Sequence, residues 1–113
     1  MVYDRFELCN TPNFITFGRT KILERDIERY LVKRVKEIGG IAYKFTSPAH
    51  RGVADRCVVL GRGQVWFIEV KTPTGKLTRL QELFWHDMLR RGQRYRVVRS
   101  YEDVDAWVGE IGL

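Results

Sequence analysis

Cysteines and long apolar runs are scarce in this sequence. Only Cys9 and Cys57 are present among 113 residues, and Cys57 lies in an apolar stretch where a buried free thiol is expected, so no disulfide framework is indicated. No apolar run approaches the roughly 20 residues of a membrane-spanning helix. Residues 1–10 mix charged with apolar side chains, unlike a secretory signal. We therefore expect an intracellular, soluble protein with no membrane partner.

Acidic residues are outnumbered by basic ones. Lys and Arg total 20 against 14 Asp and Glu, which gives a formal net charge of +6 and a pI near 9.6. This excess favours a polyanionic partner such as nucleic acid, although solubility alone would also account for it. Hydrophobic residues make up 44% of the chain, which is enough for a core, and the length fits a single domain.

Hydrophobic periodicity predicts an α/β fold. Residues 1–20 lack a clear period and are expected to form an N-terminal arm, with the folded domain at 21–113. A first helix is predicted from Lys21 to the Gly39-Gly40 stop, because these apolar residues recur at helical spacing: Leu23, Ile27, Leu31, Val35 and Ile38. The elements predicted after it are strands at 41–45, 56–60 and 65–71, a helix at 78–92, a strand at 95–98 and a helix at 100–111.

The second helix has two local signals. Thr78 with Gln81 three residues later is typical of a capping box, in which each side chain binds the backbone of the other residue. Its apolar face is expected from four residues: Leu80, Leu83, Phe84 and Met88. The whole order, α-β-β-β-α-β-α, predicts a mixed sheet flanked by helices.

Three charged residues gather near the end of a predicted hairpin. If Gly61-Arg62-Gly63 is a three-residue loop, Leu60 pairs with Gln64, and counting back along the ladder places Asp55 opposite Glu69. Lys71 shares the face of Glu69, because side chains two apart in a strand point the same way. Asp55, Glu69 and Lys71 are therefore expected to converge.

Two carboxylates facing each other across strands repel unless a cation lies between them. Mg²⁺ prefers such oxygen ligands and retains waters that can be activated, and a lysine beside it would orient water or stabilise charge on a phosphate. An exposed ion-pair group is the alternative, since alternating charges are common on strands. The apolar run Trp66–Ile68 before Glu69 argues against it, because charges that end a mostly buried strand need partners.

At these residues the sequence resembles the PD-(D/E)XK nucleases, and more narrowly their VRR-NUC branch, which occurs as stand-alone phage proteins and within a DNA-repair nuclease. The resemblance covers about residues 21–107. It is carried by Glu24-x-x-Ile27-Glu28, Gly52-Val53-Ala54-Asp55, Glu69-Val70-Lys71 and Gln81. It implies a restriction-endonuclease-like fold that hydrolyses DNA phosphodiester bonds with Mg²⁺ or Mn²⁺. A phage-encoded member would work in the host cytoplasm.

The resemblance also implies residue roles. Asp55, Glu69 and the Val70 carbonyl would hold the metal, and Lys71 would be the catalytic lysine. Gln81 is expected either to support the site or to cap its helix.

A first-helix glutamate also approaches the metal in this family, and two candidates remain open. Glu24 matches the VRR-NUC pattern, whereas Glu28 matches the spacing of the related archaeal Holliday junction resolvases. Both are expected on the apolar face of the helix. The family's usual Pro-Asp reads Ala54-Asp55 here, a change that removes backbone stiffness but no ligand atom.

Basic residues near the predicted site are candidates for contacts with DNA phosphates: Lys44, Arg51, Arg56, Lys76 and Arg79. By analogy with the family, we expect an endonuclease selective for branched DNA such as Holliday junctions, acting as a homodimer. Two alternatives remain: a basic nucleic-acid-binding module of the same fold with little or no catalytic activity, and an interaction protein whose charges merely solvate a sheet edge.

Overall fold

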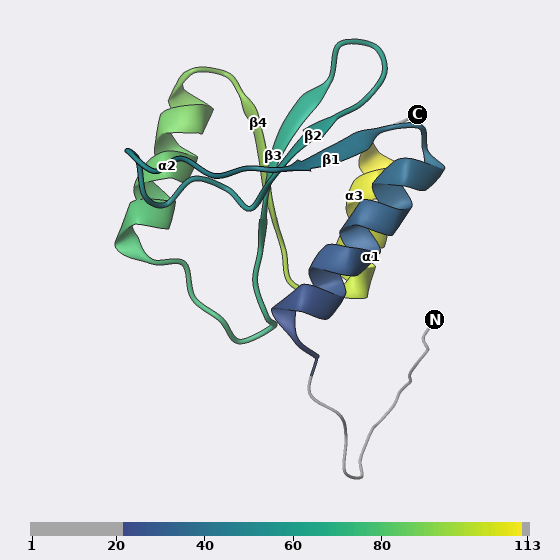
Figure 1. Cartoon of the computed structure of the whole chain (residues 1–113), viewed down its shortest axis with the longest axis horizontal. Coiled ribbons are helices and arrows are strands. Elements are labelled where there is room, and N and C mark those ends of the chain that lie inside the picture. The colour runs from purple at the N-terminus through teal and green to yellow at the C-terminus, as the bar shows by residue number, and fades with distance from the viewer. Residues whose placement is uncertain (1–21, 112–113) are drawn as a thin grey trace, which may run out of the picture.

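The computed structural model describes residues 22–111, and the predicted N-terminal arm, residues 1–20, lies outside them. The predicted order of elements is confirmed (Figure 1). The elements are α1 Glu24–Glu37, β1 Ile41–Lys44, β2 Arg56–Val59, β3 Val65–Val70, α2 Arg79–Arg90, β4 Arg94–Val98 and α3 Tyr101–Glu110. No helix in this part of the chain is long and apolar enough to cross a membrane.

The four strands form one mixed sheet in the order β1-β2-β3-β4. β1 pairs antiparallel with β2, and β2 with β3, whereas β4 lies parallel to β3 and is reached through α2. In Figure 1, α1 and α3 lie on one side of the sheet and α2 on the other. The predicted mixed sheet flanked by helices is therefore confirmed.

The hydrophobic core lies between the sheet and the pair α1 and α3. Ile27, Leu31 and Val35 of α1 are fully buried, as the helical spacing predicts. They pack with alternate residues of the strands and with α3 in one cluster, which includes Val58, Ile68, Val98, Val104 and Trp107. Every second strand residue faces this core, because strand side chains alternate between faces. The intervening residues, Glu69 among them, face α2.

The α2 side of the sheet is packed mainly by aromatic rings. Phe84 lies 5.7 Å from Phe67 and 6.3 Å from Phe45 between ring centroids, and Trp85 stacks on Tyr95 at 6.0 Å. The predicted apolar face of α2 is partly wrong. Its leucines Leu80 and Leu83 are 43% and 45% exposed, because Phe84 and Trp85 point toward the sheet and turn them outward.

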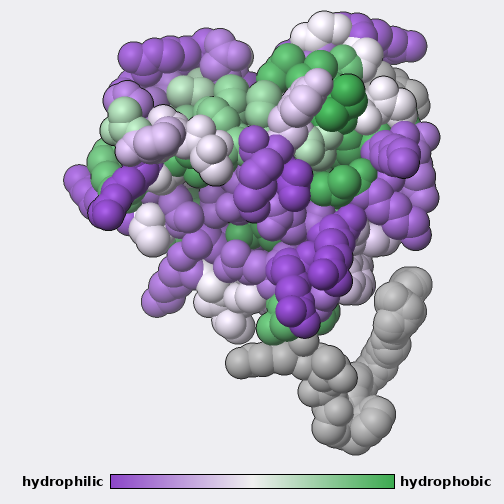
Figure 2. Space-filling view, viewed as in Figure 1, coloured by the Kyte–Doolittle hydropathy of each residue, from purple (hydrophilic) through white to green (hydrophobic). Residues whose placement is uncertain are grey.

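The predicted register of the β2–β3 hairpin is confirmed. Val59 pairs with Val65 and Arg56 with Ile68, and Leu60 N donates to Gln64 O at 2.8 Å. Arg62 and Gly63 both have positive φ, 60° and 72°, as a tight turn between antiparallel strands requires. Hydrophobic side chains are visible on this part of the surface in Figure 2. Within the hairpin, Val59 and Val65 are 38% and 39% exposed.

Candidate active site

The predicted charged residues converge where β3 ends. Continuing the β2–β3 register by one residue places Asp55 opposite Glu69. Lys71 follows on the same face, with Nζ 4.0 Å from Glu69 Oε2. The side chains of Glu69 and Lys71 are only 2% and 12% exposed. These charges are therefore enclosed, unlike an ordinary solvated pair on a strand.

Asp55 is fixed through its backbone and its side chain. Its carbonyl accepts from Phe45 N at 3.0 Å, and its Oδ2 accepts from Val70 N at 2.8 Å. Lys71 N instead donates to Val98 O on β4. Because backbone groups of successive strand residues point to alternate sides, the Val70 carbonyl lies on the same side as its N–H, toward Asp55. The Val70 carbonyl is therefore expected on the Asp55 side of β3, and its role as a metal ligand remains a prediction.

The segment before Asp55 packs closely against α2. Gly52 has φ +86°, and a Cβ there would come within 2.5 Å of the Leu80 backbone. Any other residue would be strained and would collide, so glycine is required for this close approach. Ala54 is fully buried. The segment Gly52–Asp55 therefore seats Asp55 between the end of β3 and the start of α2.

Gln81 caps its helix, as one of its two alternative predictions states, and it also contacts Glu69. Its side-chain oxygen accepts from Thr78 N at 2.8 Å, and Thr78 Oγ1 accepts from Gln81 N at 3.2 Å, which completes the capping box. Its amide nitrogen donates to Glu69 Oε2 at 3.0 Å. One amide group thus ties the start of α2 to the buried carboxylate. We call Asp55, Glu69, Lys71 and Gln81 the carboxylate site.

Glu69 lies in an environment that disfavours its charge. Burial, and next the negative charge of Asp55, raise the pKa of Glu69 to about 8, while Lys71 acts in the opposite direction and Glu24 adds to the rise. The other oxygen, Glu69 Oε1, is buried and has no hydrogen-bond partner among the described residues. Such an atom is costly to leave unpaired.

The carboxylate site fits a divalent cation. The unpartnered Glu69 Oε1, the facing Asp55 carboxylate and the Val70 carbonyl are all oxygen donors, the kind that Mg²⁺ and Mn²⁺ take. In residues 22–111, no three His, Cys, Asp or Glu side chains come close enough to form a cage by themselves. Mg²⁺ needs no such cage, because it is usually held by one or two carboxylates and completes its shell with water.

The two first-helix glutamates have different surroundings. Glu24 begins α1, and its negative charge acts on Glu69, whose pKa it helps to raise. Glu28 instead accepts from Arg56 Nε at 2.7 Å and from Lys44 Nζ at 3.2 Å. Both are predicted on the apolar face of this helix, but neither is fully buried. Glu24 is exposed and Glu28 is partly buried, whereas Ile27 of the same turn is fully buried.

Burial acts to raise the pKa of Glu28, but hydrogen bonds and charges from Arg56 and Lys44 outweigh it and lower this pKa below its usual value. Glu28 is therefore a charged and well-paired carboxylate. Its pairing leaves Glu24 as the first-helix carboxylate associated with Glu69.

No family model matches the chain. A curated relative, "Putative nuclease p44" of Acyrthosiphon pisum secondary endosymbiont phage 1, is 53% identical over 60 residues, which span 53% of this chain and 64% of that protein. A solved structure of a VRR_NUC domain matches with a TM-score of 0.73 and 30% identity, covering 76% of this chain and 94% of that one. The chain belongs to the VRR-NUC family. The fold expected from the VRR-NUC resemblance is therefore confirmed.

The basic residues predicted to contact DNA divide into two sets. Lys44 and Arg56 lie together around Glu28, and Arg56 Nη1 also donates to Ala42 O at 3.0 Å. The other three are exposed and near α2, and none of them joins this pair: Arg51, Lys76 and Arg79. Their contact with DNA remains a prediction.

Two residues near the carboxylate site of this VRR-NUC protein are not predicted from the sequence. Tyr95 of β4 is 8% exposed, and burial together with the charges of Glu69 and Asp55 raises the pKa of its hydroxyl. Arg99 donates to the carbonyls of Thr72 and Gly75 and so holds the loop after Lys71. Tyr95 lies on the same face of the sheet as Glu69. The alternation of side chains along β4 predicts this position only if the pairing of β4 with β3 is already known.

Proposed function

We propose that the chain is a Mg²⁺- or Mn²⁺-dependent nuclease that hydrolyses DNA phosphodiester bonds at the carboxylate site. The buried Glu69 beside Asp55, with Oε1 unpartnered, is the observation that carries this proposal. The protein forms these contacts at considerable cost, because two carboxylates in a buried setting repel each other. A cation between them would remove that cost.

Each residue of the carboxylate site would have a role that follows from its position. Asp55, Glu69 and the Val70 carbonyl would hold the ion, with Glu24 as the further acidic group. When bound, the ion would lower the pKa of a water molecule and neutralise charge on the phosphate. Lys71 would position the attacking water and stabilise negative charge on the phosphate. Gln81 holds Glu69 in place and leaves Oε1 available.

The proposed substrate is branched DNA such as a Holliday junction, and the proposed active form is a homodimer. The basic excess of the chain supports a polyanionic substrate. A chain of 113 residues covers only a short stretch of duplex, and a symmetric pair would present two sites to the two halves of a junction. Domain boundaries at residue 21 and a soluble, intracellular protein are part of the same proposal.

Incubation of the purified protein with branched and linear DNA, in Mg²⁺, Mn²⁺ or EDTA, tests the activity. We expect cutting with metal and none in EDTA. Asp55→Asn should cut at least about 100-fold more slowly while it still binds DNA, whereas the matched exposed variant Asp87→Asn should cut like the wild type. Binding without cutting by the wild type would support the binding module instead. Equal cutting by wild type and Asp55→Asn would refute the proposed mechanism.

A further inference from the structure

A second charged cluster lies beside the carboxylate site, on the outer side of α1 and the β1 edge of the sheet. A surface cavity of about 340 Å³ is lined by Arg25, Glu28, Arg29, Val32, Lys44 and Arg56. We call it the basic pocket. The α1 residues are spaced three and four apart, so they share one face of the helix. Lys44 and Arg56 are paired across β1 and β2.

Glu28 organises the cations of the basic pocket. It bridges Arg56 Nε and Lys44 Nζ. The side chains of Arg56 and Lys44 are 20% and 62% exposed. A phosphate presents the same features as this carboxylate, with negative oxygens that accept charge-assisted hydrogen bonds from arginine and lysine. Glu28 therefore keeps two cations in position for an anion, and it also competes with that anion for them.

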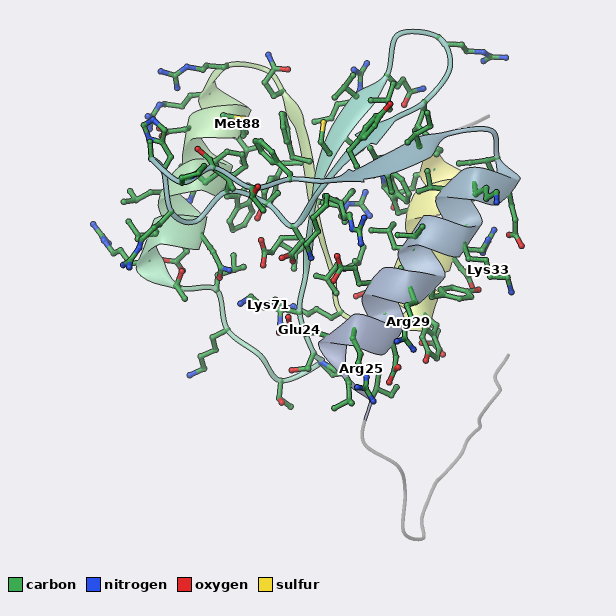
Figure 3. All side chains as sticks on the ribbon, in the orientation of Figure 1. Glu24, Arg25, Arg29, Lys33, Lys71 and Met88 are labelled. Atoms are coloured by element: carbon green, nitrogen blue, oxygen red, sulfur yellow. The ribbon has the colours of Figure 1, made fainter. Side chains whose placement is uncertain are left out.

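The cations contributed by α1 are more available than those bound to Glu28. The Arg25 side chain is 70% exposed, and its ion pair within the described residues is a long contact of 3.9 Å with Asp26. Arg29 is exposed, and it has no ion pair within residues 22–111. Figure 3 shows Arg25 and Arg29 one turn apart along α1, and hydrophilic side chains gather on this part of the surface in Figure 2. Four cationic side chains thus surround a single carboxylate.

The basic pocket also lies next to the carboxylate site along the chain. Arg25 follows Glu24, and Arg56 follows Asp55. Successive strand residues face opposite sides, so Asp55 and Arg56 direct their side chains to opposite faces of the sheet. The two regions meet at the start of α1, where the charge of Glu24 acts on Glu69 and the next residue, Arg25, lines the basic pocket. A nucleic-acid strand that passes this end of α1 would contact both regions.

We propose that the basic pocket binds a backbone phosphate of the DNA strand that is cut at the carboxylate site, with Arg29 and Arg25 as its main contacts and Glu28 as an internal competitor. This role rests on the proposed function, because that function places the cut DNA strand at the carboxylate site. It extends that function, because it assigns a phosphate site outside the metal site and gives Glu28 a role other than metal ligand.

The test measures binding of an end-labelled DNA duplex by fluorescence anisotropy in EDTA, across about 50 to 200 mM salt. Arg29→Ala and Arg25→Ala should each weaken binding about threefold or more and reduce the salt slope by about one. Glu28→Gln should tighten binding about threefold, because a charge opposed to phosphate is removed. Lys33→Ala, an exposed cation of α1 outside the pocket, serves as the matched control.

A general effect of charge would weaken Lys33→Ala as much as Arg29→Ala, and that result would overturn the proposal. Weaker binding by Glu28→Gln, in a protein whose thermal melting is unchanged, would also overturn it. The measurement in EDTA requires no cutting, so the outcome is separate from that of the proposed nuclease activity. A protein that binds through this pocket but never cuts would retain the phosphate site and lose the nuclease proposal.

Discussion

The carboxylate site and the basic pocket are adjacent and have opposite charge imbalances. In the first, Asp55 and Glu69 face each other, Lys71 contacts Glu69, and the buried Glu69 Oε1 has no partner within residues 22–111. In the second, several cations surround Glu28 alone. Burial raises the pKa of Glu69, whereas Arg56 and Lys44 lower that of Glu28 despite burial. The contrast shows that the same residue type is disfavoured as an anion in one place and favoured as an anion in the other.

Replacing one lysine from each region gives the strongest test of the difference between them. Lys71→Met should reduce the single-turnover cleavage rate at saturating DNA about 1000-fold, because Lys71 is nearly buried beside Glu69 and would act on the reacting groups in the proposed mechanism. Lys44→Met should change that rate less than about threefold and act instead on DNA affinity. Equal losses in both variants would remove the distinction between a catalytic region and a binding region.

The two glutamates of α1 should differ in metal affinity. Glu24→Gln should weaken Mn²⁺ binding about tenfold, since its charge reaches Glu69. Glu28→Gln should leave Mn²⁺ affinity within about twofold, because its carboxylate is held by Arg56 and Lys44. Isothermal titration in the absence of DNA measures both values. The reverse order would make Glu28 the metal-site glutamate, as in the resolvase-like spacing.

The smallest effect is a dependence of stability on pH. The pKa of Glu69 is raised from 4.5 to about 8, so the stability due to neutral Glu69 is complete below about pH 4.5 and is lost as the pH rises through about 8. In the proposed metal-bound form, the ion would replace the proton. The metal-dependent increase in Tm should therefore be larger at about pH 8 than at about pH 6, by about 5 °C.

Glu69→Gln is the control for this measurement. The amide cannot ionise, so the dependence of stability on pH in this range should shrink. The metal-dependent increase in Tm should shrink with it. Differential scanning fluorimetry with and without EDTA records both. An unchanged pH dependence in Glu69→Gln would assign the titration to another group.

Much of this arrangement could be predicted because it depends on local geometry. The period of Ile27, Leu31 and Val35 predicts a helix with one buried face, and the two-residue period of the hairpin predicts the register of Asp55 and Glu69. The capping box of Thr78 and Gln81 is likewise a short-range pattern. In each case the partners are close in sequence, so backbone geometry alone limits their relative positions.

Other features could not be predicted because they depend on how elements pack. The exposure of Leu80 and Leu83 follows from the orientation of α2, which the aromatic rings Phe84 and Trp85 decide. Tyr95 reaches the carboxylates only because β4 returns parallel to β3. Helical spacing places Glu24 and Glu28 one turn apart but does not reveal which of them meets Arg56.

The sequence by itself determined the elements, the pairing of the hairpin and the convergence of Asp55, Glu69 and Lys71. Tertiary structure decided the environment of each charge. Placement of α2 over β3 buries Glu69 and supplies Gln81, and placement of α1 against β1 and β2 gives Glu28 to Arg56 and Lys44. The reason is physical: the energy of a charge depends on the solvent and partners around it, and these come from elements distant in the chain.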